Sequence, residues 1–361
     1  MTSNFPANGA PAVCPSSAVS ATFAVVPANP VPIINILTVT AATFIVTGPG
    51  PGTPLAVVGG TYSLDATGLI ATFTPSAPLA PGTYNVRIVS GAAGVKDTAI
   101  PGDQLGADKT WAFTVVPATG LCLAPIDLNS ASAFGALSCA ALSGSTFGPT
   151  GTTVNGDIGT RLTSTSITNF VGGGPPPTPS IVNGTIYASD LPTAGNTVSA
   201  VAIADAYLAF LAAQTVGLTG AVIPTSNLGA ETLFGDGTPG VFYAGAYKSG
   251  SSIAISSALT LDAQGDANAV WIFYAPSSLT TSTAGGNIVL KNNAQAKNVY
   301  WVVGSSATLS APAFSGNVLA ATAISVTTLS VTVDGRLLTS GPTCAAVTWD
   351  ARLHTVNVPL P

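Results

Sequence analysis

Charged side chains are scarce in this sequence of 361 residues. They account for 6% of it, with 9 Lys and Arg against 14 Asp and Glu, whereas soluble domains average about 25%. So few cations cannot form the dense positive field that a phosphate backbone requires, so we expect no nucleic-acid partner. For the same reason we expect no binding to an anionic membrane surface.

Uninterrupted apolar runs are short as well, although the mean hydropathy is +0.53. The longest, residues 198–213, contains Asp205 and falls short of the roughly 20 residues of a membrane-spanning helix, so we expect no membrane insertion. Residues 1–15 have neither the basic start nor the apolar centre of a signal peptide, and Met1 is the only methionine. We expect these residues to be a leader on the trimmed, mature chain of a secreted or cell-surface protein.

Side chains of the kinds used in catalysis and metal binding are few. The acidic residues of the second half include Asp157, Asp190, Asp205 and Glu231. They are scattered rather than paired as in a glycosidase, and no GxSxG elbow is present. His354 is the only histidine, and no two cysteines have the CxxC spacing of a metal site. The sequence therefore predicts no enzyme, no cofactor and no metal.

The cysteines are four in number, namely Cys14, Cys122, Cys139 and Cys344. They allow three pairings, and the sequence does not choose among them. Disulfides fit an exported protein. Because Cys122 and Cys139 bracket one short segment, we predict a disulfide between these two.

Glycine (39) and proline (28) are abundant, and in residues 16–117 they separate short segments in which apolar and polar residues alternate. This pattern predicts an antiparallel β-sandwich. Residues 71–84 and 109–115 resemble the bacterial Ig-like modules of secreted surface proteins. The resemblance implies a spacer or presenter domain whose partners would be a cell surface or neighbouring domains.

The second half repeats one short phrase, in which an apolar residue, a polar residue, a glycine, any residue and an aliphatic residue follow one another. The copies are VNGDIGT (154–160), VNGTIY (182–187), FSGNVL (314–319) and VDGRLL (333–338), with Gly156, Gly184, Gly316 and Gly335. From residue 251 the chain falls into triplets of short strands with about 20 to 25 residues per turn, which is typical of a three-sided β-solenoid. Glycine suits the corners because tight turns favour a residue without Cβ.

One set of these strands, for example residues 269–275, is apolar on both sides and needs a cover. Residues 197–214 have an apolar stripe with the helical period, formed by Val201, Ala204, Leu208 and Leu211. Such a helix is about 27 Å long and spans about five or six strands stacked about 4.8 Å apart. We predict that it lies along one side of the solenoid.

Residues 120–358 resemble the secreted ice-binding (antifreeze) family of cold-adapted microbes. The motifs are IDLNSASAFGALS (126–138), VNGDIGT (154–160), VNGTIYASD (182–190), residues 246–273, NVYWVVGSSATL (298–309) and VDGRLLT (333–339). The resemblance implies a mainly β domain over 118–361, with a discontinuous three-sided solenoid, a capping insertion and one long helix alongside. It also implies a flat face that binds ice without catalysis and gives thermal hysteresis and recrystallisation inhibition. The loop at 172–179 departs from the family's pattern, which leaves the first two turns less defined.

The face that contacts ice should be flat, uncharged and covered with small hydroxyl and methyl groups. One set of strands is excluded because alternation points Asp262, Lys291 and Asp334 outward. In the remaining set Leu279 and Leu309 point inward, and their neighbours point outward. The predicted ice-binding residues are Ser166, Thr168, Ser252, Ala254, Ser256, Ser278, Thr280, Ser282, Thr308, Ser310, Ser325, Thr327, Ala346 and Thr348.

A structural cell-surface adhesin or a carbohydrate-binding module is the alternative function, since threonine favours strands for reasons unrelated to ice. Such a module would present exposed aromatic rings rather than hydroxyls. Trp349 distinguishes the two interpretations, because an exposed indole beside the predicted face would favour stacking on a sugar.

Overall fold

The computed structural model describes residues 1–14, 17–24, 33–49, 56–65, 67–98, 102–115, 123–145, 151–172, 181–191, 195–327, 330–350 and 352–359. The chain forms two compact units. One comprises Met1–Cys122 with Gln264–Asp266, and the other comprises Leu123–Ala263 with Ala267–Pro361.

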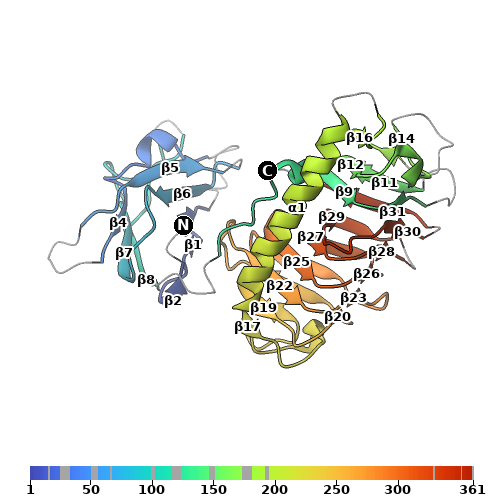
Figure 1. Ribbon diagram of the computed structural model, residues 1–361. Coiled ribbons are helices and arrows are strands. Elements are labelled where there is room, and N and C mark those ends of the chain that lie inside the picture. Colours follow the sequence, from blue (N-terminus) through green and yellow to red (C-terminus); the bar gives the residue numbers. More distant parts are fainter. Residues whose placement is uncertain are drawn as a thin grey trace. The chain divides into compact units, whose positions relative to one another are not determined.

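The first unit is a β-sandwich of two four-stranded sheets (Figure 1). One sheet is antiparallel, in the order β1 (Ser3–Phe5), β3 (Val19–Thr22), β6 (Ile70–Pro75) and β5 (Gly60–Leu64). The other has the order β2 (Ala10–Val13), β8 (Lys109–Val115), β7 (Gly82–Ile88) and β4 (Phe44–Thr47). The short helix η1 (Ile36–Thr38) precedes β4. Alternation along the strands buries Phe44, Phe73 and Trp111 in one core, and the predicted sandwich is confirmed.

The expected leader, residues 1–15, is described as far as residue 14, and this part contributes strands to the sandwich. Strand β1 pairs with β3, and β2 pairs in parallel with β8, so both belong to the sheets of the sandwich. Each is a short edge strand with few side chains in the core, among them Val13. Such strands leave little alternation for sequence analysis to detect.

The second unit is a β-solenoid of parallel strands with three faces (Figure 1). We name the first the serine–threonine face. Its described strands follow the order β13 (Ile167–Thr168), β10 (Leu142–Ser143), β30 (Val347–Trp349), β28 (Ile324–Val326), β26 (Ala307–Leu309), β23 (Leu279–Thr281) and β20 (Ile253–Ile255). Strands from the first turns thus stack on the last turn. The discontinuous solenoid that the resemblance implied is confirmed.

The other two faces share long strands that pass through a corner. The helix face comprises β17 (Ala221–Val222), β19 (Gly245–Lys248), β22 (Trp271–Ala275), β25 (Val299–Val303), the C-terminal halves of β27 (Ala313–Ala320) and β29 (Thr332–Thr339), β9 (Phe134–Ser138), β12 (Asp157–Thr160) and β16 (Ile186–Tyr187). The third face comprises β18 (Val241–Phe242), β21 (Leu259–Asp262), β24 (Ile288–Lys291), the N-terminal halves of β27 and β29, β31 (His354–Asn357), β11 (Thr152–Asn155), β15 (Ile181–Val182) and β14 (Val171–Gly172). Short helices η2 (Asn129–Ala133), η3 (Ser164–Ser166), η4 (Leu228–Ala230) and η5 (Ala296–Asn298) join strands.

The corner glycines of adjacent turns lie directly against one another. Gly316 has φ +117°, in the region that favours glycine. A Cβ on Gly335 would overlap the carbonyl oxygen of Gly316, to which it is paired in register. The repeated phrase therefore has two causes, which are the turn conformation and the close approach of one turn to the next.

The helix α1 (Gly195–Leu218) crosses the strands of the helix face, as predicted (Figure 1). Its buried side, however, is formed by other residues than the predicted stripe, namely Ser199, Ala202, Ile203, Ala206, Ala209, Phe210 and Ala213. The residues Val201, Leu208 and Leu211 are exposed. The helix is apolar almost all round, so periodicity alone did not identify the side that packs. Alanines face the sheet because they allow the helix to approach the large side chains of β22 and β25.

Aromatic rings form a stack inside the solenoid. The ring centroid of Phe273 lies 5.3 Å from that of Tyr247 and 4.5 Å from that of Trp301. The ring centroids of Phe314 and Trp301 are 5.6 Å apart. The indole nitrogen of Trp301 donates to the carbonyl of Ser315 at 3.0 Å. Because the interior is filled in this way, each strand of the serine–threonine face rests on a rigid core.

Candidate functional site

One column of small side chains runs down the centre of the serine–threonine face. The register of the parallel strands places it on neighbouring positions in the order Thr168, Ser143, Thr348, Ser325, Thr308, Thr280 and Ala254. Parallel strands are about 4.8 Å apart, so seven strands extend over about 29 Å. None of these seven side chains is buried. The column is therefore a straight row of hydroxyl and methyl groups at a constant rise.

Along each strand, the neighbours of the column residues point inward and are anchored in the core. Leu142, Leu279, Leu309, Ile324 and Val347 are at most 1% exposed. They alternate with the outward residues along each strand, as predicted for Leu279 and Leu309. This alternation fixes the height of the outward side chains above the core.

Hydroxyl groups on adjacent turns hold one another in place. The Oγ–Oγ distances are 2.9 Å for Ser252 and Ser278, and 3.0 Å for Ser310 and Thr327. In the column, the hydroxyl of Thr168 donates to Ser143 at 3.1 Å, and those of Ser325 and Thr348 lie 3.2 Å apart. These contacts restrict the rotamers before any ligand is bound, which lowers the entropy lost on binding.

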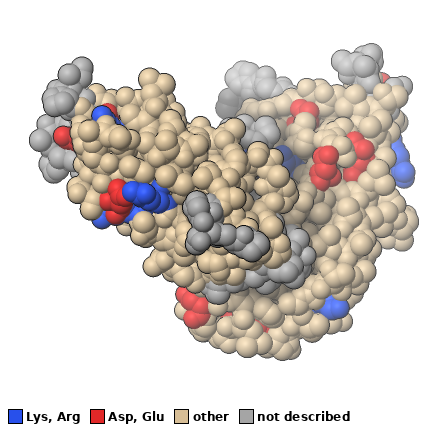
Figure 2. Space-filling model, turned by 90° about the vertical axis from the view of Figure 1, so that its left-hand side faces the viewer, with Lys and Arg blue, Asp and Glu red and all other residues tan. Residues whose placement is uncertain are grey.

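Charge is confined to the margins of the face. Its described strands contain no Asp, Glu, Lys or Arg. Asp350 follows β30, and its carboxylate lies 2.8 Å from Nε2 of His354. At the opposite edge, hydrogen bonds from the amide and hydroxyl of Ser164 lower the pKa of Asp190. Figure 2 views the molecule from the left-hand side of Figure 1 and so does not look onto this face; on the side that it shows, charged side chains form small, separate groups on a largely uncharged surface.

The predicted residues fall into rows around the central column. Thr168, Ala254, Thr280, Thr308, Ser325 and Thr348 lie in the column itself. Ser252, Ser278 and Ala346 precede their strands, and Ser256, Ser282 and Thr327 follow theirs; all six are partly or fully exposed. Two predicted residues differ from this arrangement. Ser166 ends the helix η3 rather than lying in a strand. Ser310 is buried, because its amide donates to Oγ1 of Thr281 and draws it inward.

The sequence analysis missed Ser143, which lies in the column between Thr168 and Thr348. The segment Ala141–Leu142–Ser143 alternates like the others, but it forms a strand of only two residues. Its place became clear only from the stacking of the first turns on the last, which the order of the sequence does not reveal.

Trp349 points into the core. It is 5% exposed and makes an edge-to-face contact with Phe170, with ring centroids 5.4 Å apart. The described strands of the face therefore present no aromatic ring on which a sugar could stack.

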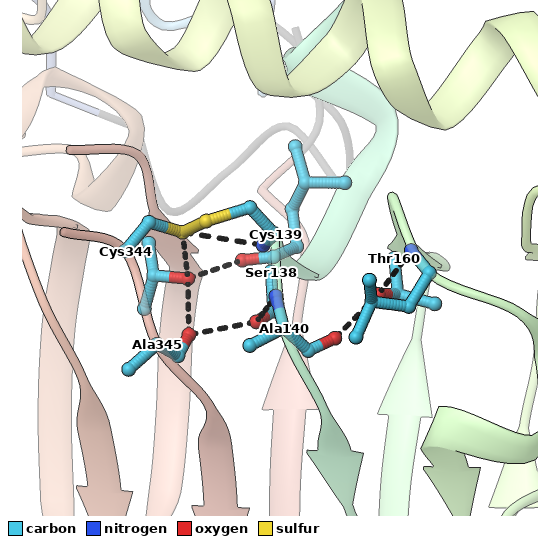
Figure 3. The surroundings of a disulfide bond; sticks show 9 residues. Ser138, Cys139, Ala140, Thr160, Cys344 and Ala345 are labelled. Carbon is cyan, nitrogen blue, oxygen red and sulfur yellow. Dashed lines mark hydrogen bonds between the residues drawn. A yellow bond between two sulfur atoms is a disulfide. The ribbon is translucent and has the colours of Figure 1, made fainter. Parts of the chain in front are cut away.

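A disulfide links the first turn of the solenoid to the last. It joins Cys139, after β9, to Cys344, before β30, across a sequence separation of 205 residues (Figure 3). The predicted Cys122–Cys139 pairing is wrong, because Cys139 stacks beside a distant segment rather than beside its neighbour in sequence. Cys122 lies outside the described residues. The hydroxyl of Ser138 also bridges the junction, donating to the carbonyl of Ala345 at 2.8 Å.

Among the described residues, no group of three or more His, Cys, Asp or Glu side chains could hold a metal ion. The buried imidazole of His354 lies beside a single carboxylate. Its Nδ1 accepts the amide of Val331 at 3.2 Å, and burial lowers its pKa although the hydrogen bond to Asp350 opposes this. These groups therefore support the last turn rather than form a reactive centre.

Comparison with known proteins matches the two units to two families. The ice-binding-like family matches residues 139–352, and the bacterial Ig-like domain matches residues 1–115. An ice-binding protein of Nostoc sp. (strain HG1) is 38% identical over 226 residues, which cover 62% of this chain and 71% of that protein. Ice-binding protein 1 of Shewanella frigidimarina is 42% identical over 95 residues, 26% of this chain and 10% of that much longer protein. The crystal structure of an ice-binding protein from Antarctomyces psychrotrophicus superposes with a TM-score of 0.50 at 35% identity, covering 66% of this chain and all of that one.

Proposed function

This chain belongs to the ice-binding-like family, and from that premise we propose that it adsorbs to ice through the serine–threonine face. The observation that supports this assignment is the central column, in which small uncharged side chains repeat in register from Thr168 to Ala254. The face is long, carries no charged side chain on its described strands and is backed by a rigid core.

The chemistry of the face suits an ordered layer of water. Hydroxyl groups donate and accept hydrogen bonds, while the methyl groups of Thr and Ala leave neighbouring water bonded to itself. Long charged side chains would hold water in other geometries and project unevenly. The face thus presents a repeating array of small groups rather than a pocket. Because the groups repeat, we expect the protein to bind ice through many weak contacts.

Adsorbed protein obstructs growth of the crystal, so we expect thermal hysteresis and inhibition of recrystallisation. We propose no catalytic step, since the described strands of the face carry hydroxyl and methyl groups but no carboxylate, imidazole or thiol. The buried position of Trp349 weighs against the carbohydrate-binding alternative.

The disulfide and the Ig-like unit support a location outside the cell, because disulfides persist in oxidising compartments. We propose that the protein is secreted or displayed at the cell surface. The Ig-like unit would serve as a spacer towards a cell surface or further domains, and its partners would be of that kind.

The test is a substitution that spoils flatness without disturbing the core. Thr308→Tyr enlarges one side chain of the column while Leu309 stays buried. We expect thermal hysteresis to fall severalfold, with a change in the free energy of unfolding of under about 0.5 kcal/mol.

The matched control is Val289→Tyr, on the third face, where Val289 is exposed next to the strand end that carries Lys291. It should retain the activity. If Val289→Tyr loses hysteresis and Thr308→Tyr keeps it, the third face binds ice and our residue assignment is wrong.

A further inference from the structure

Strand β20 is the last strand at one end of the serine–threonine face, where an uncovered strand would leave an open edge (Figure 1). Unpaired backbone groups on such an edge invite pairing with another chain. The amides that face this edge belong to Ala254 and Ser256, and the segment before η4 satisfies both. The amide of Ala254 donates to the carbonyl of Ser226 at 2.6 Å, and that of Ser256 donates to Oδ1 of Asn227 at 3.2 Å. The edge is therefore closed.

Asn227 continues the central column. It pairs in parallel with Ala254, the last of the column residues named above. Its backbone is extended, with φ −104° and ψ 102°, and the residue is partly exposed. The register that sets Ala254 beside Thr280 places Asn227 at an eighth position. The row thereby lengthens from about 29 Å to about 34 Å.

Asparagine suits this position because the strand ends here. In a continuing parallel ladder the amide of Ser256 would donate to the carbonyl of Leu228. That carbonyl instead accepts the amide of Glu231 at 3.1 Å, at the end of η4. The side-chain oxygen of Asn227 replaces it as the acceptor, which leaves the two hydrogens of Nδ2 as donors. Among the described residues Nδ2 has no acceptor, so these hydrogens are available to water.

Buried contacts fix the height of this eighth position. Leu228, the next residue, is fully buried in the core of the solenoid. Gly229 packs so closely against Ser257 that a Cβ on the glycine would overlap Oγ of the serine. The same hydroxyl donates to the carbonyl of Gly229 at 3.0 Å. Asn227 is thus supported from beneath, like the other residues of the column.

Charge is kept away from this end of the face. Residues 220–230 contain no Asp, Glu, Lys or Arg. Glu231 follows them but is only 4% exposed. Its carboxylate accepts the amides of Thr232 and Leu233 at 2.8 and 3.0 Å, and the hydroxyl of Thr225 at 3.4 Å. The eighth position therefore shares the properties of the other seven, since it is in register, uncharged and backed by the core.

From these observations we propose that Asn227 is a further ice-binding residue at the end of the column. This inference rests on the proposed function of the serine–threonine face. The Nδ2 group donates to the ordered layer of water, while Oδ1 holds the amide of Ser256. The face thus ends in a side chain that bonds to water rather than in an open strand.

The first experiment is the substitution Asn227→Asp. It keeps the size of the side chain and an oxygen that accepts the amide of Ser256, but it replaces the donor hydrogens with a negative charge. We expect thermal hysteresis to fall severalfold, with an unchanged temperature of unfolding.

The matched control is Asn35→Asp in the first unit. Asn35 is also partly exposed and directly precedes a short helix, η1. Its Oδ1 likewise accepts a backbone amide, that of Leu37 at 3.1 Å. This variant should retain full hysteresis. Hysteresis that survives in Asn227→Asp, or that is lost equally in Asn35→Asp, overturns the proposal.

The second experiment tests whether Asn227 closes the edge. Exchange of the Ser256 amide with deuterium, followed by NMR, should be slow in the wild type and in Asn227→Asp. It should be much faster in Asn227→Ala, which lacks the acceptor. Slow exchange in Asn227→Asp shows that this end of the face is still folded, so a loss of hysteresis there reports contact with ice. Equal exchange in the wild type and in Asn227→Ala would show that Asn227 does not close the edge.

The variant Thr308→Tyr separates this inference from the proposed function. If Thr308→Tyr loses hysteresis and Asn227→Asp keeps it, the face binds ice but its contact ends at Ala254. If Thr308→Tyr keeps hysteresis, the proposed function of the face fails, and the role of Asn227 fails with it.

Discussion

At the scale of single residues, His354 shows how a buried imidazole supports the last turn. Its Nδ1 accepts the amide of Val331, so Nε2 holds the proton and donates to Asp350. Protonating Nδ1 would turn this acceptor into a second donor facing the amide. Burial accordingly lowers the pKa of His354 in the folded protein, with partial compensation by Asp350.

The sign of the pH dependence follows from this shift. As the pH falls, His354 takes up its proton near pH 6.5 in the unfolded chain, and only at a lower pH in the folded protein. The contribution of His354 is complete above about pH 6.5 and is lost as the pH falls towards the lower folded pKa. We expect the urea concentration at the unfolding midpoint to decrease as the pH is lowered from about 7.5 to about 5.5. The variant His354→Gln should be less stable at pH 7.5 and should show a smaller fall over the same interval. Equal slopes for the two proteins would mean that another group titrates.

At the scale of elements, sequence analysis was most successful where alternation had one apolar and one polar side. The strands containing Thr280, Thr308 and Thr348 were correctly grouped in one sheet, because their inward neighbours are large and aliphatic. The same method placed the wrong side of α1 inward. There both sides are apolar, and the choice depends on the shape of the sheet beneath, which favours alanine. Short strands such as β10 carry too few residues for any period.

The alanine side of α1 gives a prediction for packing. Ala206 and Ala209 are at most 2% exposed against the helix face. Replacing either with Leu inserts three carbon atoms where no space exists, and we expect a loss of about 1–3 kcal/mol in the free energy of unfolding. Ala212→Leu, on the exposed side, should change it by under about 0.5 kcal/mol. Chemical denaturation of the three variants checks this, and an equal effect at Ala206 and Ala212 would place the helix in a different rotation.

At the scale of the whole molecule, the disulfide is the feature that local sequence did not predict. Cys139 and Cys344 are neighbours because the first turn stacks on the last. The spacing of the cysteines along the sequence does not indicate this stacking. In the chain-entropy description a loop of 205 residues contributes up to about 5 kcal/mol. The double variant Cys139→Ser/Cys344→Ser should unfold at a lower temperature. Peptide mapping without reduction should recover the Cys139–Cys344 link, and a Cys122–Cys139 link would contradict the structure.

The two units should divide their tasks. We expect residues 118–361 alone to retain thermal hysteresis, and residues 1–117 alone, which include strands β1 and β2 of the sandwich, to have none, because the row of hydroxyl and methyl groups lies in the solenoid. Each fragment is compared with the full chain at equal molar concentration. Shaping of ice crystals by the isolated sandwich would show that the assignment of function to the second unit is incomplete.

The stacking of the first turns on the last also governs the order of assembly. Strand β10 pairs with β13 and with β30, and β9 pairs with β29. During synthesis at about 5–20 residues per second, the early strands wait on the order of 10–40 s for their partners. The serine–threonine face is thus completed only once β30 has been synthesised, so until then β10 lacks its neighbour on that side.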